Sequence, residues 1–433
     1  MSASLFTPHF KQTPYWWDAA ARPVEDEQAS LPSDVQVLVV GSGYTGLHAG
    51  LQTARAGMST LIVDADELGA GCSSRNGGQV SYGVKGSFSE LASKHGPQLA
   101  TDLLADGVRA MDFLETFIAD EGIECAWARV GRFSGAHNSR AYDAMASTLA
   151  TTPKAVATEW HMVSKAEQHS EIGSDFYQGG AVFPNDAALQ PAQYHAGLLQ
   201  RVRSAGATTI GHCAVLTIEK AGAGYLVHTS RGPVRAGQVA IATNGYTGGV
   251  TPWLRRRVIP IGSYIIATEP FDRALADEIS PHNRVMSDSR RLVFYYRLSP
   301  DRTRMIFGGR VALKETDPKM SAPRLHDAMS QIFPQLTDTG VSHSWLGFVG
   351  YTFDTLPHTG VYNGLHYAMG YCGSGVSLSS YCGAKMGRRI AGLEEADTAF
   401  DRIRFQTRPM YSGNPWFLKP AVLYYKLRDR LNF

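Results

Sequence analysis

The sequence predicts an α/β protein in which a domain of parallel strands and helices is interleaved with an α+β domain built on an antiparallel sheet. Three observations support this prediction. A glycine-rich turn, residues 41–46, separates a β-branched run from a helical segment, β-type runs crowd the stretch 258–310, and a second glycine turn, residues 370–376, leads into another helical segment. Strands that alternate with helices are typical of a parallel sheet, whereas consecutive strands are typical of an antiparallel one.

The first glycine turn has the spacing of a dinucleotide-binding fingerprint, Gly41-x-Gly43-x-x-Gly46. The apolar run before it, residues 35–40, suits a parallel strand buried on both faces, and a helix is expected over 47–56. In this arrangement the glycines allow a tight turn, close approach of a pyrophosphate, and close packing of helix on strand. The helix N-terminus then directs unpaired N–H groups at the phosphates. The turn therefore predicts a Rossmann-like nucleotide-binding unit.

An acidic residue and a second glycine-rich segment narrow the nucleotide to FAD. Asp64 ends the next expected strand, residues 59–63, close to the roughly 20-residue spacing after the fingerprint that suits a carboxylate on a ribose hydroxyl. The segment from Ser73 to Gln79 reads SSRNGGQ, and together with the fingerprint it favours FAD over NAD. Because no second fingerprint begins another strand–helix unit, we expect electrons to come from an organic substrate and not from a nicotinamide.

The composition excludes several classes of protein. The chain has 433 residues, of which 44% are apolar, and a formal net charge of +2, which gives no sign of a nucleic-acid-binding surface. Five scattered cysteines predict reduced thiols in the cytoplasm.

No apolar run is long enough to span a membrane, and neither a metal-ligand spacing nor the Gly-x-Ser-x-Gly motif of hydrolases occurs. The C-terminal segment is expected to be an amphipathic helix that packs on protein, with attachment to a membrane surface as the alternative.

These patterns divide the chain into four parts. Residues 1–33 form an N-terminal arm, residues 34–95, 185–257 and 340–400 a discontinuous FAD-binding domain, residues 96–184 and 258–339 the substrate domain, and residues 401–433 a helical tail. Within these parts the sequence predicts helices over 92–122, 191–205 and 377–392, an antiparallel hairpin over 212–230, and strands over 238–242 and 367–369.

These motifs, taken in order, resemble the FAD-dependent amine and amino-acid oxidoreductases of the D-amino acid oxidase superfamily, above all the bacterial γ-glutamylputrescine oxidoreductase branch. The resemblance covers nearly the whole chain. It is carried by VGSGYTGL at the first turn, GAGCSSRNGGQ at 69–79, IATNGY at 241–246, PIGSYIIATEP at 260–270, IFGGR at 306–310, the WxG and TxDxLP motifs between 345 and 357, and GYCGSGVSLS at 370–379.

The resemblance implies which residues hold the cofactor. The pyrophosphate would lie on Gly41, Ser42, Gly43, Tyr44, Thr45 and Gly46, and the ribose on Asp64. The ribityl chain and flavin edge would lie on Ser73, Ser74, Arg75, Asn76, Gly77, Gly78 and Gln79. Adenine would contact the backbone of Val215, the pyrophosphate would also pass Thr243, Asn244 and Gly245, and the pyrimidine end of the ring would face Gly373, Ser374, Gly375, Val376 and Ser377.

Two departures from related sarcosine oxidases affect the expected chemistry. Those enzymes carry a flavin-linked cysteine near the position of Gly347 and a carboxylate-binding lysine near that of Ser377. This chain has neither residue, so the resemblance implies a non-covalent FAD and argues against sarcosine as substrate.

The predicted reaction is oxidation of a C–N bond in an amine or amino acid, with a γ-glutamylated amine such as γ-glutamylputrescine favoured. A hydride equivalent would pass to flavin N5, and the imine would hydrolyse to an aldehyde or keto acid. Aromatic walls at Tyr264, Tyr296 and Trp345 would orient the substrate, and Arg310 would pair with a carboxylate.

Several alternatives stay open at this point. The electron acceptor is oxygen, or else a quinone or carrier protein served by an amino-acid dehydrogenase of the D-amino acid or pipecolate type. A flavin-binding subunit or sensor without turnover is the alternative from another class. The number of subunits is open, with a homo-oligomer as one option.

Overall fold

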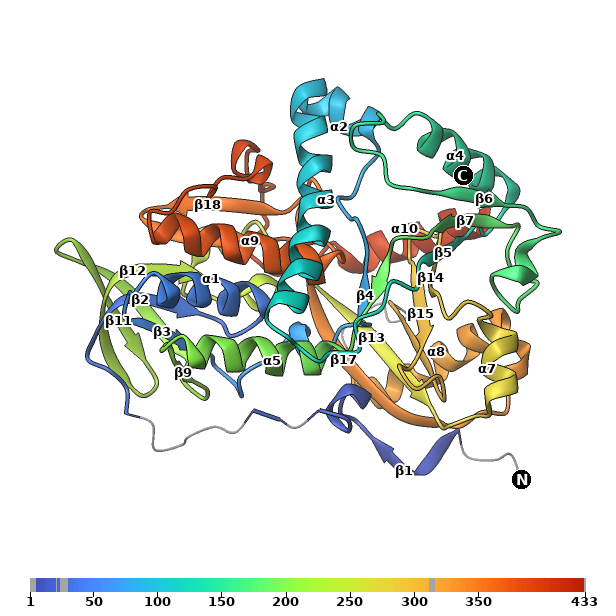
Figure 1. Ribbon diagram of the computed structural model, residues 1–433, viewed down its shortest axis with the longest axis horizontal. Helices are drawn as coiled ribbons and strands as arrows, with labels where there is room; N and C mark the ends of the chain where they lie inside the picture. Colours follow the sequence, from blue (N-terminus) through green and yellow to red (C-terminus); the bar gives the residue numbers. More distant parts are fainter. Residues whose placement is uncertain (1–4, 21, 24–29, 311–315, 432–433) are drawn as a thin grey trace.

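The computed structural model describes residues 5–20, 22–23, 30–310 and 316–431, which fold around two large β-sheets (Figure 1). The first sheet has eight strands in the order β10-β11-β12-β2-β3-β9, and β19, with β18 beside it, also pairs with β12. Its strands are β2 (Asp34–Val40), β3 (Thr60–Val63), β9 (Thr208–Ile210), β10 (Val215–Ala221), β11 (Gly224–Thr229), β12 (Gly232–Ile241), β18 (His358–Tyr362) and β19 (Leu365–Met369). The pairs that join β12, β2, β3, β9 and β19 are parallel.

Helices cover one face of this sheet and form a common core with it. They are α1 (Tyr44–Arg55), α3 (Pro97–Asp120), α5 (Pro191–Ser204) and α9 (Gly375–Ile390), which Figure 1 shows around the left half of the molecule. Two glycines of α9 explain why it lies so close to α1: a Cβ atom at Gly383 or Gly387 would overlap the carbonyl oxygens of Thr45 and Ala49. Small residues at these positions therefore let the two helix backbones touch.

The second sheet has nine strands in the order β1-β17-β13-β16-β15-β14-β5-β7-β6. Its pairs are antiparallel except β1–β17 and β14–β5. The strands are β1 (Phe6–Lys11), β5 (Arg132–Gly135), β6 (His161–Val163), β7 (Gly180–Phe183), β13 (Ile259–Thr268), β14 (Val285–Asp288), β15 (Phe294–Leu298), β16 (Met305–Gly309) and β17 (Val341–Tyr351).

The two faces of the nine-stranded sheet have different neighbours. One face packs on α7 (Arg273–Ile279) and α8 (Pro318–Ile332), which lie at the lower right of Figure 1. The other face packs on the N-terminal segment around Trp16 and on Ala192 of α5. Residues that alternate along β13 and β15 therefore point either to α8 or to the first sheet and its helices.

The predicted fold class is confirmed, but two segments belong to a different core from the one that the sequence predicted. The helical run 92–122 breaks at Gly96 into α2 (Phe88–His95) and α3, and the apolar side of α3 packs with α1 and α9 instead of the substrate domain. β17, expected in the FAD-binding domain, pairs along its whole length with β13. Both differences have the same cause. The core in which an amphipathic helix or strand is buried depends on its tertiary partners, and the local sequence does not identify those partners.

The predicted hairpin is present as β10 and β11, and the C-terminal tail ends in a helix, α10 (Leu418–Leu431). On α10, Val422 is buried, whereas Leu423 and Leu427 are exposed. Within the described part of the chain, no helix is both long enough and apolar enough to cross a membrane.

Candidate cofactor and active site

The first glycine turn connects β2 to α1 and leaves no room for side chains. Gly41 has a φ of +106°, and a Cβ atom there would lie 2.9 Å from the carbonyl oxygen of Ala242. A Cβ atom at Gly46 would overlap the carbonyl oxygen of Gly41. The N-cap of α1, Gly43, offers no side-chain hydrogen bond, so the first turn of the helix has N–H groups for a ligand. One of them, on Tyr44, donates to Ser73 Oγ at 3.0 Å.

Asp64 follows β3 and supports this turn from the neighbouring strand. Its Oδ2 accepts hydrogen bonds from the N–H and the hydroxyl of Ser42, at 2.8 and 2.6 Å. Within the described residues its Oδ1 accepts a single long bond, from the Asp66 N–H at 3.3 Å, which leaves acceptor capacity for a hydroxyl group. The N–H of Cys213 donates to the Asp64 carbonyl at 2.7 Å and thereby brings the start of β10, with Val215, to this side of the sheet.

Three tryptophans fix the segment 73–79, two of them from the N-terminal arm. Trp16 Nε1 donates to the Asn76 carbonyl at 2.8 Å, and Trp17 Nε1 donates to Ser74 Oγ at 3.0 Å. Trp345 Nε1 donates to the Arg75 carbonyl at 2.8 Å. The sequence predicted an N-terminal arm, and the structure shows that this arm holds the segment 73–79.

Arg297 is a further support that the sequence did not reveal. It lies on β15, is buried, and donates from Nη1 to the carbonyls of Gly78 and Leu189, both at 2.9 Å. Burial lowers the pKa of Arg297 to about 10, so its guanidinium is still charged at neutral pH. In the described part of the chain its hydrogen bonds go to backbone carbonyls, so no side-chain motif in the sequence marks it.

The second glycine turn leads into α9. Gly370 and Gly373 have φ angles of +85° and +102°, and the N-cap, Ser374, makes no side-chain hydrogen bond to the helix. Asn244 Oδ1 accepts from the Gly370 N–H at 2.9 Å, which ties the predicted segment 243–245 to this turn.

The residues present fit the FAD that the sequence predicts. The helices that follow the two glycine turns, α1 and α9, pack directly on each other, and neither N-cap residue, Gly43 or Ser374, caps its helix with a side-chain hydrogen bond. The turn at α1 excludes side chains, as the binding of a diphosphate requires, while Ser73 Oγ accepts from the Tyr44 N–H and so holds the segment 73–79 beside Gly43. The remaining N–H groups at the two helix N-termini, one set for phosphate and one for the partial negative charge of a flavin edge, agree with this cofactor.

The predicted substrate residues do not come together. Tyr264 and Tyr296 are fully buried on the face of the sheet that packs on α8, so their side chains point away from the segment 73–79. Tyr296 donates to the Tyr177 hydroxyl at 2.7 Å, and Tyr264 accepts from the Thr316 N–H at 2.8 Å. Arg310 donates to the Gly262 carbonyl at 2.8 Å and borders the undescribed residues. Trp345 contacts the segment with its side chain, through its bond to the Arg75 carbonyl, whereas Tyr296 contacts it only with its backbone carbonyl, which accepts from Gln79 Nε2 at 3.0 Å.

The neighbouring residue, Tyr295, occupies the face that Tyr296 was expected to occupy. A Cβ atom at Gly77 would lie 3.0 Å from its ring, and its hydroxyl is 2.8 Å from Ser263 Oγ. Burial raises the pKa of Tyr295, so the hydroxyl is neutral. The sequence contains both tyrosines side by side, and only the pairing of β15 shows which one faces the cofactor segment.

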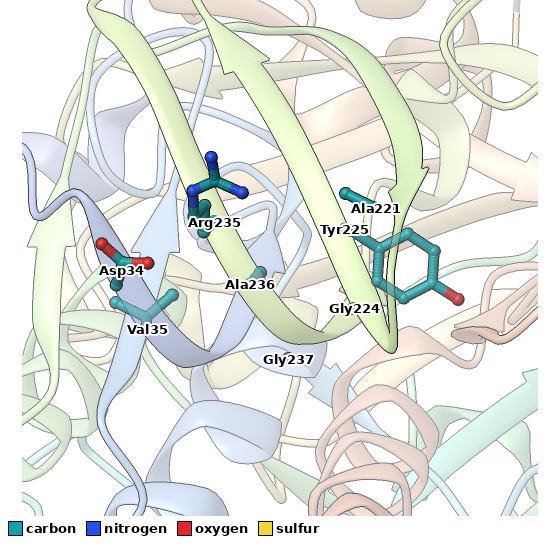
Figure 2. Close-up of a pocket in the computed structure, with 8 residues that line it drawn as sticks. All are labelled: Asp34, Val35, Ala221, Gly224, Tyr225, Arg235, Ala236 and Gly237. Carbon is teal, nitrogen blue, oxygen red and sulfur yellow. The ribbon is translucent and has the colours of Figure 1, made fainter.

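A shallow pocket of about 190 Å³ lies elsewhere, at the start of β2 (Figure 2). It is lined by Asp34, Val35, Ala221, Gly224, Tyr225, Arg235, Ala236 and Gly237. Because Asp34 begins β2 and the first glycine turn follows its other end, this pocket lies at the opposite edge of the sheet from the glycine turn.

Comparisons with known proteins agree with this arrangement. Residues 36–389 match the family model described as FAD dependent oxidoreductase. The chain is 30% identical to the probable oxidoreductase OrdL of Rhizobium meliloti over 96% of this chain and 97% of that protein. It is 27% identical to the gamma-glutamylputrescine oxidoreductase of Escherichia coli over 94% and 96% of the two chains. Among solved structures, glycine oxidase from Geobacillus kaustophilus superposes with a TM-score of 0.72 at 18% identity, covering 87% of this chain and 99% of the oxidase.

Proposed function

Because this chain belongs to the family of FAD dependent oxidoreductases, we propose that it oxidises a carbon–nitrogen bond of an amine or amino acid. FAD is the cofactor of this family. The resemblance described above implies that it would lie on the two glycine turns and on the segment between Ser73 and Gln79. When bound, FAD supplies the acceptor for a hydride equivalent. The chain itself supplies binding, orientation and exclusion of water.

One observation carries the proposal of a substrate site between the sheets. The nine-stranded sheet presents Tyr295 and Ser263 to the segment 73–79, which is the part of the cofactor site expected to hold the flavin. A substrate that reaches this face would meet an aromatic ring and two hydroxyl groups. Gly308 leaves room for the Tyr295 ring itself, because a Cβ atom at Gly308 would overlap that ring. A neutral amine needs little further acid–base help from side chains.

Within this class of substrates we favour a γ-glutamylated amine such as γ-glutamylputrescine. The support is the match to the Escherichia coli relative, which runs along nearly the whole of both chains. Residues at the site agree with an extended amine, since Tyr295 is an aromatic surface for an alkyl chain or cation. The alternative, an amino-acid dehydrogenase that reduces a quinone, uses the same cofactor and differs in the acceptor.

An anaerobic titration of the FAD-loaded protein tests the proposed function. The panel contains γ-glutamylputrescine, putrescine, glycine, D-alanine, L-proline and pipecolate, and the absorbance of the oxidised flavin is recorded. Bleaching by γ-glutamylputrescine at the lowest concentration is the expected result. If dithionite bleaches the flavin and no amine does, the proposal is wrong. Admitting air or a soluble quinone to the bleached protein then identifies the acceptor.

A further inference from the structure

A short extended segment, Ser81–Gly86, presents alternate residues to the second glycine turn. A Cβ atom at Gly83 would lie 2.7 Å from Ser374 Oγ, and a Cβ atom at Gly373 would lie 3.9 Å from Lys85 Nζ. The residues that alternate with them, Tyr82, Val84 and Gly86, line a separate cavity beside α2 and α3. The period of two therefore turns Lys85 toward the glycine turn and its neighbours away from it.

Lys85 meets a tyrosine from the end of β17. Its Nζ donates to the Tyr351 hydroxyl at 3.1 Å and lies 4.8 Å from the centre of the Tyr351 ring. The Tyr351 hydroxyl is itself 3.7 Å from the position of a Cβ atom at Gly373. Tyr351 lies four residues after Gly347 on β17, and Gly347 pairs with Ser263, so Tyr351 is on the same face of the nine-stranded sheet as Ser263.

Among the residues that the structure describes, no carboxylate lies within ion-pair distance of the Lys85 ammonium group, and the positive charge of Arg291 acts on it from nearby. Burial lowers the pKa of Lys85, but Tyr351 and Cys372 together raise it by more than burial lowers it. The pKa therefore lies above its usual value, and Lys85 is cationic at neutral pH. A partly buried cation without an anionic partner is poorly compensated. An anion bound beside Lys85 would compensate the charge of its ammonium group.

We propose that Lys85 and Tyr351 bind a carboxylate of the substrate and so select amines that carry one. The inference rests on the proposed function. A carboxylate oxygen would accept from the Lys85 ammonium, and the Tyr351 hydroxyl would donate to the same group. Lys85 thereby takes the role that the sequence suggested for Arg310. The ligand class is an amino acid or an amine acylated by an amino-dicarboxylic acid.

The test uses two small probes of nearly equal shape, propionate and propionamide, titrated calorimetrically into the FAD-loaded protein. We expect Lys85→Met to weaken propionate binding by about 10- to 100-fold, the range for a hydrogen bond to a charged group. Binding of propionamide should not change. Lys85→Arg should restore most of the propionate affinity, and Tyr351→Phe should give a smaller loss than Lys85→Met.

A kinetic comparison adds a second readout. With γ-glutamylputrescine, Lys85→Met should raise KM and leave kcat within about twofold, whereas with an amide of butyrate and putrescine, which lacks the carboxylate, KM should not change. Unaltered propionate affinity in both Lys85→Met and Tyr351→Phe would overturn the proposal. So would loss of FAD from Lys85→Met, because the ammonium would then belong to the cofactor. If propionate binding depends on Lys85 and no amine reduces the flavin, the anion site stands and the proposed function fails.

Discussion

Trp345 donates its indole N–H to the carbonyl oxygen of Arg75 at 2.8 Å and so joins the long strand β17 to the segment that follows the first nucleotide-binding unit. The indole is fully buried, and the segment it holds is the one that carries the Arg-Asn-Gly-Gly motif. The nine-stranded sheet thus contributes to the cofactor site by fixing the backbone of Arg75. This contribution does not require Trp345 to contact the cofactor.

Replacing Trp345 with Phe should weaken FAD binding about 5- to 10-fold. The change removes one buried hydrogen bond of about 1 kcal/mol and leaves the Arg75 carbonyl without that donor. The dissociation constant is measured by flavin fluorescence during titration of the apoprotein. Trp127→Phe is the control, because Trp127 also loses an indole hydrogen bond, to Glu115, but does not contact the segment 73–79. Equal losses in the two variants would contradict the role of Trp345.

Gly46→Ala should abolish FAD retention and lower the free energy of unfolding. A Cβ atom at this position overlaps the Gly41 carbonyl oxygen, so either α1 or the turn has to move. Gly248→Ala is the matched control, since a Cβ atom there has no heavy atom within 4 Å. The flavin-to-protein absorbance ratio after purification and the urea midpoint give the two readouts. If the Gly46→Ala protein retains FAD and has the wild-type urea midpoint, the turn can accommodate a Cβ atom at position 46 and the prediction is wrong.

The adjacent tyrosines give a paired prediction, because they point to opposite faces of one strand. Tyr295→Phe should lower kcat/KM for the best amine several-fold, since Tyr295 borders the segment 73–79. Tyr296→Phe should instead lower the free energy of unfolding by about 1 kcal/mol through loss of its bond to Tyr177, with kcat/KM retained. Steady-state kinetics and denaturant unfolding are measured on both variants. The reverse assignment of effects would mean that the α8 face is the catalytic one.

The sequence predicted those parts of the fold and of the site that depend on local patterns of residues. The turns at Gly41 and Gly373, the hairpin from 212 to 230 and the helix after Pro191 are local patterns, and the structure contains all of them. The choice between Tyr295 and Tyr296 depended on strand register, which a one-residue shift reverses.

Two supports of the site came from more distant parts of the fold. Lys85 and Arg297 lie outside every recognised motif. Lys85 reaches the second glycine turn, and Arg297 the segment 73–79, only because parts of the chain that are distant in sequence come together. The assignment of β17 to the nine-stranded sheet has the same origin, since its partner β13 is distant in the chain. Such contacts between residues distant in sequence cannot be predicted from local sequence patterns.

The stability of the protein should fall on acidification in a way that depends on His195. This residue is buried on α5 and its Nε2 is 2.8 Å from the carbonyl oxygen of Ser42, in the first glycine turn. Burial lowers its pKa to about 4, from a usual value of 6.5. Between these two pH values the unfolded state therefore binds more protons than the folded state, so this contribution to stability is complete above pH 6.5 and is lost as the pH falls toward 4.

The corresponding slope is at most about 1.4 kcal/mol per pH unit for one group. Urea unfolding at intervals from pH 7 to pH 4.5 measures it, and His195→Gln, which keeps a hydrogen-bond donor but does not titrate, should flatten the curve by that amount. His228→Gln is the control, because the His228 side chain is 42% exposed, whereas that of His195 is buried. If His195→Gln follows the wild-type curve, the imidazole does not remain neutral beside Ser42, and acid loss of stability has to be assigned to other groups.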